Sequence, residues 1–160
     1  MAGLAEPMRL RPASAQDMDA LMAVMAAAFD PRFGEAWTAA QAMTLFALPG
    51  TRMMLAEDDG GVTGFSAARL AGPESELLLL GVVPSRRRQG VGAALIADWL
   101  AWARAAGAAE AFLEMRADNP ALSLYRTAGF AECGRRPQYY RGGDGAVRDA
   151  ITMCHHIIAK

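Results

Sequence analysis

The sequence lacks the features by which membrane, secreted and nucleic-acid-binding proteins are usually identified. Its formal net charge is −1, so there is no global positive field to attract nucleic acid or an anionic membrane. No apolar run is long enough to span a bilayer, and Glu6 stands where a signal peptide would have its apolar core. These absences predict a cytoplasmic protein whose partners include neither nucleic acid nor a membrane.

Cysteine and histidine are also scarce, with two residues of each. Cys133 and Cys154 are far apart and form no CxxC pair, which favours two reduced, buried thiols. His155 and His156 are adjacent on a predicted strand and point to opposite faces, so they are poorly placed to share a metal ion. We therefore expect no metal site. No Ser-His-Asp or Cys-His arrangement for nucleophilic catalysis is evident either.

Length and composition fit one globular domain. The chain has 160 residues, of which 53% are hydrophobic and 21% charged, an ordinary balance for a folded protein. A chain of this length buries about two thirds of its unfolded surface. We expect residues 1–160 to form a single domain without repeats or linkers.

The most informative stretch joins an apolar run to a basic, glycine-rich turn. Residues 77–83 read LLLLGVV and stop at Pro84, which predicts a strand buried on both faces. Residues 85–92, SRRRQGVG, precede a helical pattern that continues to about Ala106. Glycines let the backbone approach a ligand, the first N–H groups of a helix lack internal partners, and arginines suit phosphate oxygens. The stretch predicts a site for a ligand that carries phosphate, with pyrophosphate favoured.

Two common phosphate-binding motifs are excluded by this turn. A P-loop needs Gly-Lys followed by Ser or Thr, and neither Gly90 nor Gly92 is followed in that way. A Rossmann turn needs GxGxxG, and only Gly90-Val91-Gly92 is present. A basic surface turn that caps a helix is the alternative for residues 87–92 alone, but the preceding strand and following helix disfavour it.

The remaining patterns predict the order β-α-α-β-β-β-α-β-α-β-β. Capping boxes at Ser14–Asp17 and Thr38–Gln41 mark the first two helices. The expected strands cover residues 8–11, 52–57, 62–70, 77–83, 109–116, 130–140 and 147–156, and the later helices cover about 91–106 and 119–125. This order predicts a mixed sheet with helices on both sides.

The order and the run RRQGVG at 87–92 resemble the GNAT acetyltransferase superfamily, whose acyl-CoA signature is (Q/R)xxGx(G/A). The resemblance covers nearly the whole chain and implies the α/β acyl-CoA N-acyltransferase fold, with acetyl-CoA as cosubstrate. It also implies direct attack of an amine on the thioester, without a metal or a covalent enzyme intermediate. The residues that it assigns to acetyl-CoA are Leu80, Gly81, Val82, Arg87, Arg88, Gln89, Gly90, Val91, Gly92, Ala93 and Asn119.

The C-terminal half resembles the ribosomal-protein alanine N-acetyltransferase (RimI-like) branch. The residues that carry the resemblance are LEMR at 113–116 with Asn119, LY at 124–125, GF at 129–130, YY at 139–140 and DAITM at 149–153. Between Glu114 and Tyr125 the chain is one residue shorter than that branch, and Arg148-Asp149 replaces its usual Glu-Asp pair.

Two catalytic residues follow from the branch resemblance and from the needs of the reaction. The attacking amine must be neutral, and the resemblance makes Glu114 the base that takes its proton. Tyr125 is then the donor of a proton or hydrogen bond to the departing thiolate. The structural alternatives are a Glu114–Arg116 ion pair and a Tyr125 ring packed on Phe130. If Glu114 is not the base, Glu35 or Glu110 becomes the better candidate.

Three functions remain open at this level. The favoured one is acetylation of a protein N-terminal α-amine, such as that of a ribosomal protein beginning with Ala. The second is acetylation of a small-molecule amine. The third is a non-catalytic acyl-CoA-binding module, which would not require Glu114 or Tyr125.

Overall fold

The computed structural model describes residues 7–157, which include one seven-stranded mixed sheet with the order β1-β2-β3-β4-β5-β7-β6. The strands are β1 (Arg9–Pro12), β2 (Thr51–Asp58), β3 (Gly61–Ala71), β4 (Glu74–Val82), β5 (Glu110–Arg116), β6 (Ala131–Arg141) and β7 (Val147–His156). The helices are α1 (Met18–Ala28), α2 (Ala39–Ala47), α3 (Val91–Ala105) and α4 (Leu122–Thr127). The predicted order of strands and helices and the mixed sheet are confirmed.

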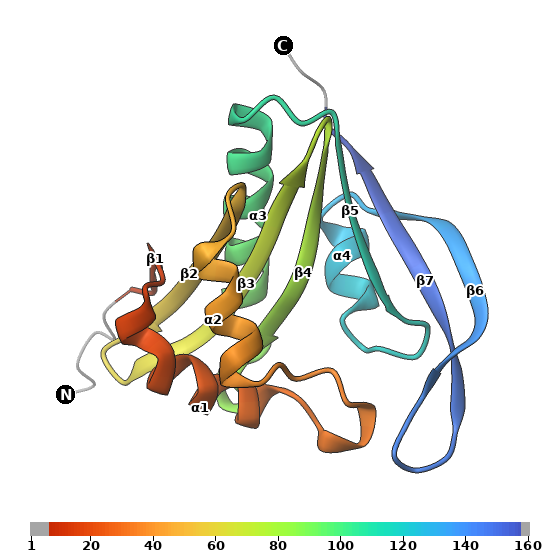
Figure 1. The fold of residues 1–160 in the computed structure, drawn as a ribbon, viewed down its shortest axis with the longest axis horizontal. Coiled ribbons are helices and arrows are strands. Elements are labelled where there is room, and N and C mark those ends of the chain that lie inside the picture. The colour runs from red at the N-terminus through yellow and green to blue at the C-terminus, as the bar shows by residue number, and fades with distance from the viewer. Residues whose placement is uncertain (1–6, 158–160) are drawn as a thin grey trace.

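The helices cover the two faces of the sheet (Figure 1). Successive side chains of a strand therefore pack against different helices. Met53 and Leu55 of β2 pack with α1 and α2, whereas Met54 and Ala56 pack with α3. This alternation follows from the two-residue period of a strand. A larger cluster around Trp99 joins α3 and α4 to β5 and β7.

Local sequence signals determine where the first two helices begin. Asp17 accepts a hydrogen bond from the Ser14 N–H at 2.8 Å, and a single turn of 3-10 helix leads into α1. Thr38 and Gln41 form the reciprocal capping box at the start of α2. Both predicted capping boxes are therefore present, because each satisfies N–H groups that the first helical turn leaves free.

The sheet opens between β4 and β5. These strands are parallel and pair only over Glu74–Leu77 and Glu110–Leu113, after which they separate (Figure 1). Leu78 is an extra residue in the pairing of β4 with β3, because Ala67 faces Leu79 while Ala68 faces Leu77. Such a bulge bends a strand and increases its twist. The bend accompanies the opening of the sheet.

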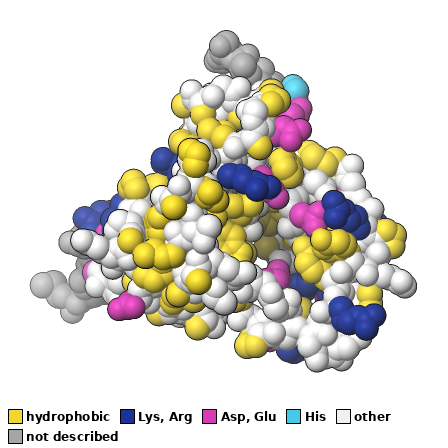
Figure 2. Space-filling model, viewed as in Figure 1, with side chains coloured by type: hydrophobic (Ala, Val, Ile, Leu, Met, Phe, Trp, Pro, Cys, Tyr) yellow, Lys and Arg dark blue, Asp and Glu magenta, His cyan; other side chains and the backbone are white. Residues whose placement is uncertain are grey.

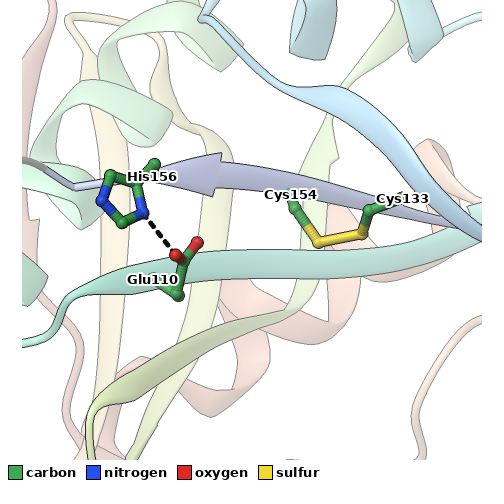
Figure 3. The surroundings of a disulfide bond; sticks show 4 residues. All are labelled: Glu110, Cys133, Cys154 and His156. Atoms are coloured by element: carbon green, nitrogen blue, oxygen red, sulfur yellow. Dashed lines mark hydrogen bonds and ion pairs between the residues drawn. A yellow bond between two sulfur atoms is a disulfide. The ribbon is translucent and has the colours of Figure 1, made fainter.

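The two cysteines correct one of the sequence-based expectations, because they form a disulfide between β6 and β7 (Figure 3). Cys133 is exposed and lies where the pairing of β6 with β7 shifts between Glu132 and Gly134. That irregularity brings Cys133 beside Cys154, which is 21 residues away in sequence. The expectation of two reduced, buried thiols is therefore wrong, and the cytoplasmic location loses that support.

Two other expectations concern the chain ends and the membrane. Glu6, on which the signal-peptide argument depends, lies outside the described residues. Within residues 7–157, every helix is too short or too polar to cross a bilayer.

The disulfide generates a stability prediction. Reduction should lower the free energy of unfolding by about 2–4 kcal/mol, because the intact bond restricts the unfolded chain between residues 133 and 154. Urea unfolding with and without a dithiol measures the difference, and a Cys133→Ser/Cys154→Ser variant should not respond to the dithiol. Two freely titrating thiols in the untreated native protein would contradict the assignment.

Candidate functional site

The opening between β4 and β5 is a cleft of about 590 Å³. Its walls come from the α1–α2 connection, the end of β4, the start of α3, the end of β5, and α4 with the loop before it. In the space-filling view, the surface of the molecule is hollowed near the middle (Figure 2). Most of the predicted ligand-contacting residues line the cleft: Leu80, Gly81, Val82, Arg87, Arg88, Gly90, Val91, Gly92, Ala93, Asn119 and Tyr125.

The basic turn adopts a backbone conformation that aims the start of α3 at the cleft. Gly90 is the N-cap of α3 and has φ +86°, a conformation that residues with a side chain rarely adopt. The first intrahelical bond runs from the Ala94 N–H to the Gly90 carbonyl, so the preceding N–H groups of the first turn have no intrahelical acceptor. These donors and the positive end of the helix dipole favour an anion.

Gly92 allows α3 and α4 to approach each other at the floor of the cleft. A Cβ atom at position 92 would lie 2.9 Å from the Leu124 Cδ2 atom, closer than such atoms pack. The glycine therefore lets the first turn of α3 reach the helix that carries Tyr125.

The residues of the basic turn have different surroundings. Arg86 bonds Asp58 at 2.8 Å, and Arg87 donates to the carbonyl oxygens of Val82 (3.2 Å) and Ala28 (2.7 Å). Arg88 has φ +61° and lines the cleft. Gln89 instead donates to the Ser85 carbonyl oxygen and does not line the cleft, so its side chain lies apart from the other predicted residues.

The end of β4 directs backbone groups into the cleft. The Val83 N–H donates to the Thr63 carbonyl of β3 at 2.9 Å, and Gly81 lies opposite Phe65. Because an antiparallel strand alternates its hydrogen-bonding sides, Leu80 and Val82 direct their N–H groups toward the opening. Donors in such a position suit an oxygen that gains negative charge.

Asn119 and Tyr125 come from the connection after β5 and from α4. The Asn119 side-chain oxygen accepts from the Ala121 N–H at 2.9 Å, which shapes the start of α4. Tyr125 packs edge-on against Phe130, with 6.1 Å between the ring centroids. It also lines the cleft, so this packing does not remove it from the site. Burial raises the pKa of the Tyr125 phenol, and the charge of Glu35 adds to the shift. The hydroxyl therefore keeps its proton at neutral pH.

Glu114 is not part of the cleft wall. It lies half-buried on β5, two residues before Arg116 and on the same strand face. Burial raises the pKa of Tyr140, and the charges of Glu114 and Glu35 add to it, so both carboxylates lie near that phenol. The suggested Glu114–Arg116 ion pair is not formed, because Arg116 bonds Glu35 at 3.1 Å and Asp118 at 2.6 Å.

Phe33 and Arg116 also line the cleft, although neither was predicted to do so, and Glu35 was expected only as a reserve candidate for the base. Pro31–Phe33 forms a turn of 3-10 helix that ends at Gly34, with φ +63°. Asp30 caps this turn through the Arg32 N–H at 2.9 Å. The signal was the DPRFG run at 30–34, which encodes a defined turn and thereby places Phe33 and Glu35 in the cleft.

Comparison with known proteins agrees with this architecture. The model of the acetyltransferase (GNAT) family matches residues 19–130. The chain belongs to this family. The ribosomal-protein-S18-alanine N-acetyltransferase from Escherichia coli has a solved structure that superposes with a TM-score of 0.85 at 25% identity, over 96% of each chain.

Curated relatives come from more than one acetyltransferase group. A mycothiol acetyltransferase of Clavibacter michiganensis is 42% identical over 91 residues, which is 56% of this chain and 30% of that protein. The N-alpha-acetyltransferase RimI of Mycobacterium tuberculosis is 34% identical over 122 residues, 73% of each chain. The chain spans about a third of the length of the mycothiol acetyltransferases that it matches. Family membership and the acetyltransferase names of these relatives favour an enzyme over the non-catalytic module.

Proposed function

We propose that this N-acetyltransferase moves the acetyl group of acetyl-CoA to a primary amine, and that the favoured acceptor is the N-terminal α-amine of a protein. The observation that carries the proposal is the cleft between β4 and β5, in which the donors at the start of α3 and the Tyr125 hydroxyl share one cavity. Support for acetyl-CoA comes also from a Salmonella typhimurium acetyltransferase solved with its cofactor acetyl-CoA, which shares the fold at a TM-score of 0.80.

The cleft provides a path for both ends of acetyl-CoA. The pyrophosphate would bind the backbone N–H groups between Arg88 and Ala93, where the helix dipole favours negative charge. The thioester would lie along the exposed edge of β4, with its carbonyl oxygen toward the N–H groups of Leu80 or Val82. Asn119 and Tyr125 face this path from the other wall.

The chemistry is a direct substitution at the thioester carbonyl. The neutral amine attacks the carbonyl carbon, a base takes a proton from nitrogen, and the carbon–sulfur bond then breaks. The sulfur leaves as a thiolate that receives a proton or hydrogen bond from Tyr125. Because its proton is retained at neutral pH, the phenol is available as a donor when charge develops on sulfur.

Glu114 is our proposed base, and Glu35 is its rival. Within residues 7–157, Glu114 takes part in no ion pair, so no cation competes for its lone pairs. Glu35 contacts the cleft directly but is tied to Arg116.

The acceptor has one specific alternative. The RimI-like relatives of Escherichia coli and Mycobacterium tuberculosis support a protein α-amine. The 42% identity to a mycothiol acetyltransferase supports a small-molecule amine as the second candidate. We also infer that residues 1–160 belong to one domain, since β1 and β7 lie in the same sheet. A cytoplasmic location remains a prediction.

The cosubstrate assignment is tested at Gly90. Gly90→Val should weaken acetyl-CoA binding by about tenfold or more, because loss of one charge-assisted hydrogen bond costs about 1.5–3 kcal/mol. Gly107→Val is a matched control: Gly107 has φ +88°, also has open space, and lies past the opposite end of α3. Calorimetry on folded protein should show near-normal affinity in the control, and equal losses in both variants would count against the site.

Transfer itself is tested at Tyr125. The protein should release free CoA from acetyl-CoA when a peptide beginning with Ala is added, and Tyr125→Phe should slow turnover by about 10²–10⁴-fold. Affinity for acetyl-CoA should stay the same, because Phe keeps the contact with Phe130. A thiol-release assay over peptides and small amines measures turnover and also ranks the two acceptor classes. Unchanged turnover would leave Tyr125 a packing residue only.

The base is tested by comparing Glu114→Gln with Glu35→Gln. An α-amine titrates near pH 8, so loss of the base should cost about 10²–10⁴-fold at pH 7 and less as the pH rises through the pKa of the amine. Loss of a residue that only positions the acceptor should give a deficit that does not change with pH. A pH-dependent deficit in Glu35→Gln together with a flat one in Glu114→Gln would transfer the role to Glu35.

A further inference from the structure

Phe33 belongs to the part of the cleft wall that the connection between α1 and α2 provides. It ends the Pro31–Phe33 turn, and the left-handed Gly34 that follows allows both Phe33 and Glu35 to line the cleft. The α3 turn, the β4 edge and α4 form the walls proposed for acetyl-CoA. The acceptor must therefore approach along the wall that contains Phe33 and Glu35.

Two guanidinium groups from other elements hold the Phe33 ring. The Cζ atom of Arg116, at the end of β5, lies 3.6 Å from the ring centroid, and that of Arg148, on β7, lies 4.9 Å from it. Asp118 joins the two arginines, with 2.6 Å to Arg116 and 2.8 Å to Arg148. Cation–π contacts strengthen when they are shielded from water, and only 7% of the Arg116 side chain is exposed. The position of the ring therefore depends on β5 and β7 as well as on its own loop.

The backbone adds a second connection between the same segments. The Gly143 N–H, in the β6–β7 turn, donates to the Arg32 carbonyl oxygen at 2.6 Å. In the same turn, Asp144 pairs with Arg148 at 2.9 Å. We call this set of contacts the clasp: the Phe33 ring with Arg116 and Arg148, the bridging Asp118, the Asp144–Arg148 pair, and the Arg32–Gly143 hydrogen bond.

The clasp should persist throughout the neutral pH range. Hydrogen bonds from Arg148 and from the Ala146 N–H hold the pKa of Asp144 at about 2, below its usual 3.8. A lowered carboxylate pKa contributes stability that is present above the usual value and is lost as the pH falls toward 2. The ion pair at Asp144 is therefore intact at any pH at which an amine is acetylated.

We propose that Phe33, fixed by the clasp, is a specificity-determining residue that restricts the acceptor to an amine on a small group, such as the α-amine of Ala or Gly. The inference rests on the proposed acetyl transfer. A cleft of about 590 Å³ must take the thioester end of acetyl-CoA as well as the acceptor. A ring held by guanidinium groups from β5 and β7 cannot swing aside for a bulky acceptor without breaking the contacts to Arg116 and Arg148. The size limit is thus built into the fold.

The test compares Phe33→Ala with Met43→Ala. Met43 is an exposed hydrophobic residue of α2 that does not line the cleft, so Met43→Ala is a control for the truncation of an apolar side chain. Arg32 does not serve as a control, because its guanidinium also lies 5.1 Å from the centroid of the Phe33 ring. Two peptides that differ only in beginning with Ala or Leu serve as acceptors. Phe33→Ala should lower the Ala-over-Leu ratio of kcat/KM by about tenfold or more, as expected when a hydrophobic wall is removed. Met43→Ala should leave the ratio unchanged.

A second measurement tests the clasp independently of catalytic activity. Hydrogen exchange at residues 142–147 should accelerate in Phe33→Ala and stay normal in Met43→Ala, because Arg148, which pairs with Asp144 of the turn, loses its contact with the Phe33 ring only in the first variant. Phe33→Leu retains bulk without the aromatic face and should accelerate exchange while keeping most of the selectivity. Unchanged exchange in Phe33→Ala overturns the clasp, and accelerated exchange with an unchanged ratio overturns the specificity role. If the native protein acetylates no amine, the proposed function fails and the exchange data still decide the clasp.

Discussion

The separation of β4 from β5 is the constraint on which the site depends. Beyond Leu77 and Leu113 the strands no longer exchange hydrogen bonds, so backbone groups at the end of β4 face an opening instead of a neighbouring strand. Unpaired backbone groups away from water are costly, and such an edge is stable when water or a bound ligand completes its bonds. The opening also gives the first turn of α3 and the Tyr125 hydroxyl a common cavity.

Charge is divided between the two sides of this opening. The start of α3 and Arg88 line the part of the cleft proposed for an anionic ligand, whereas Glu35 lines the part proposed for a cationic amine. Arg116 lies at the boundary, nearly buried and paired with Glu35 and Asp118. Removing one partner of so buried a pair would leave an uncompensated charge, so the acceptor side is held as a unit.

Much of the fold could be predicted because its signals are local. Capping boxes at Ser14 and Thr38 and the apolar run at 77–83 each depend on residues close in sequence. The RRQGVG turn was informative for the same reason, since Gly90 and the helix start that it caps are neighbours. The roles of Gln89 and Arg116 could not be predicted, because each depends on partners that the chain brings together only after folding.

The sequence by itself determined the order of elements and the glycine-rich basic turn at the start of α3, and its family resemblance pointed to Asn119 and Tyr125, which line the cleft. Tertiary structure decided that Cys133 pairs with Cys154 and that Arg116 forms its ion pair with Glu35 instead of Glu114. It also decided that arginines from β5 and β7 contact the Phe33 ring. The physical reason is the range of the interactions involved. Backbone propensity and capping act within a few residues, whereas ion pairs and disulfides depend on which strands lie side by side and in what register.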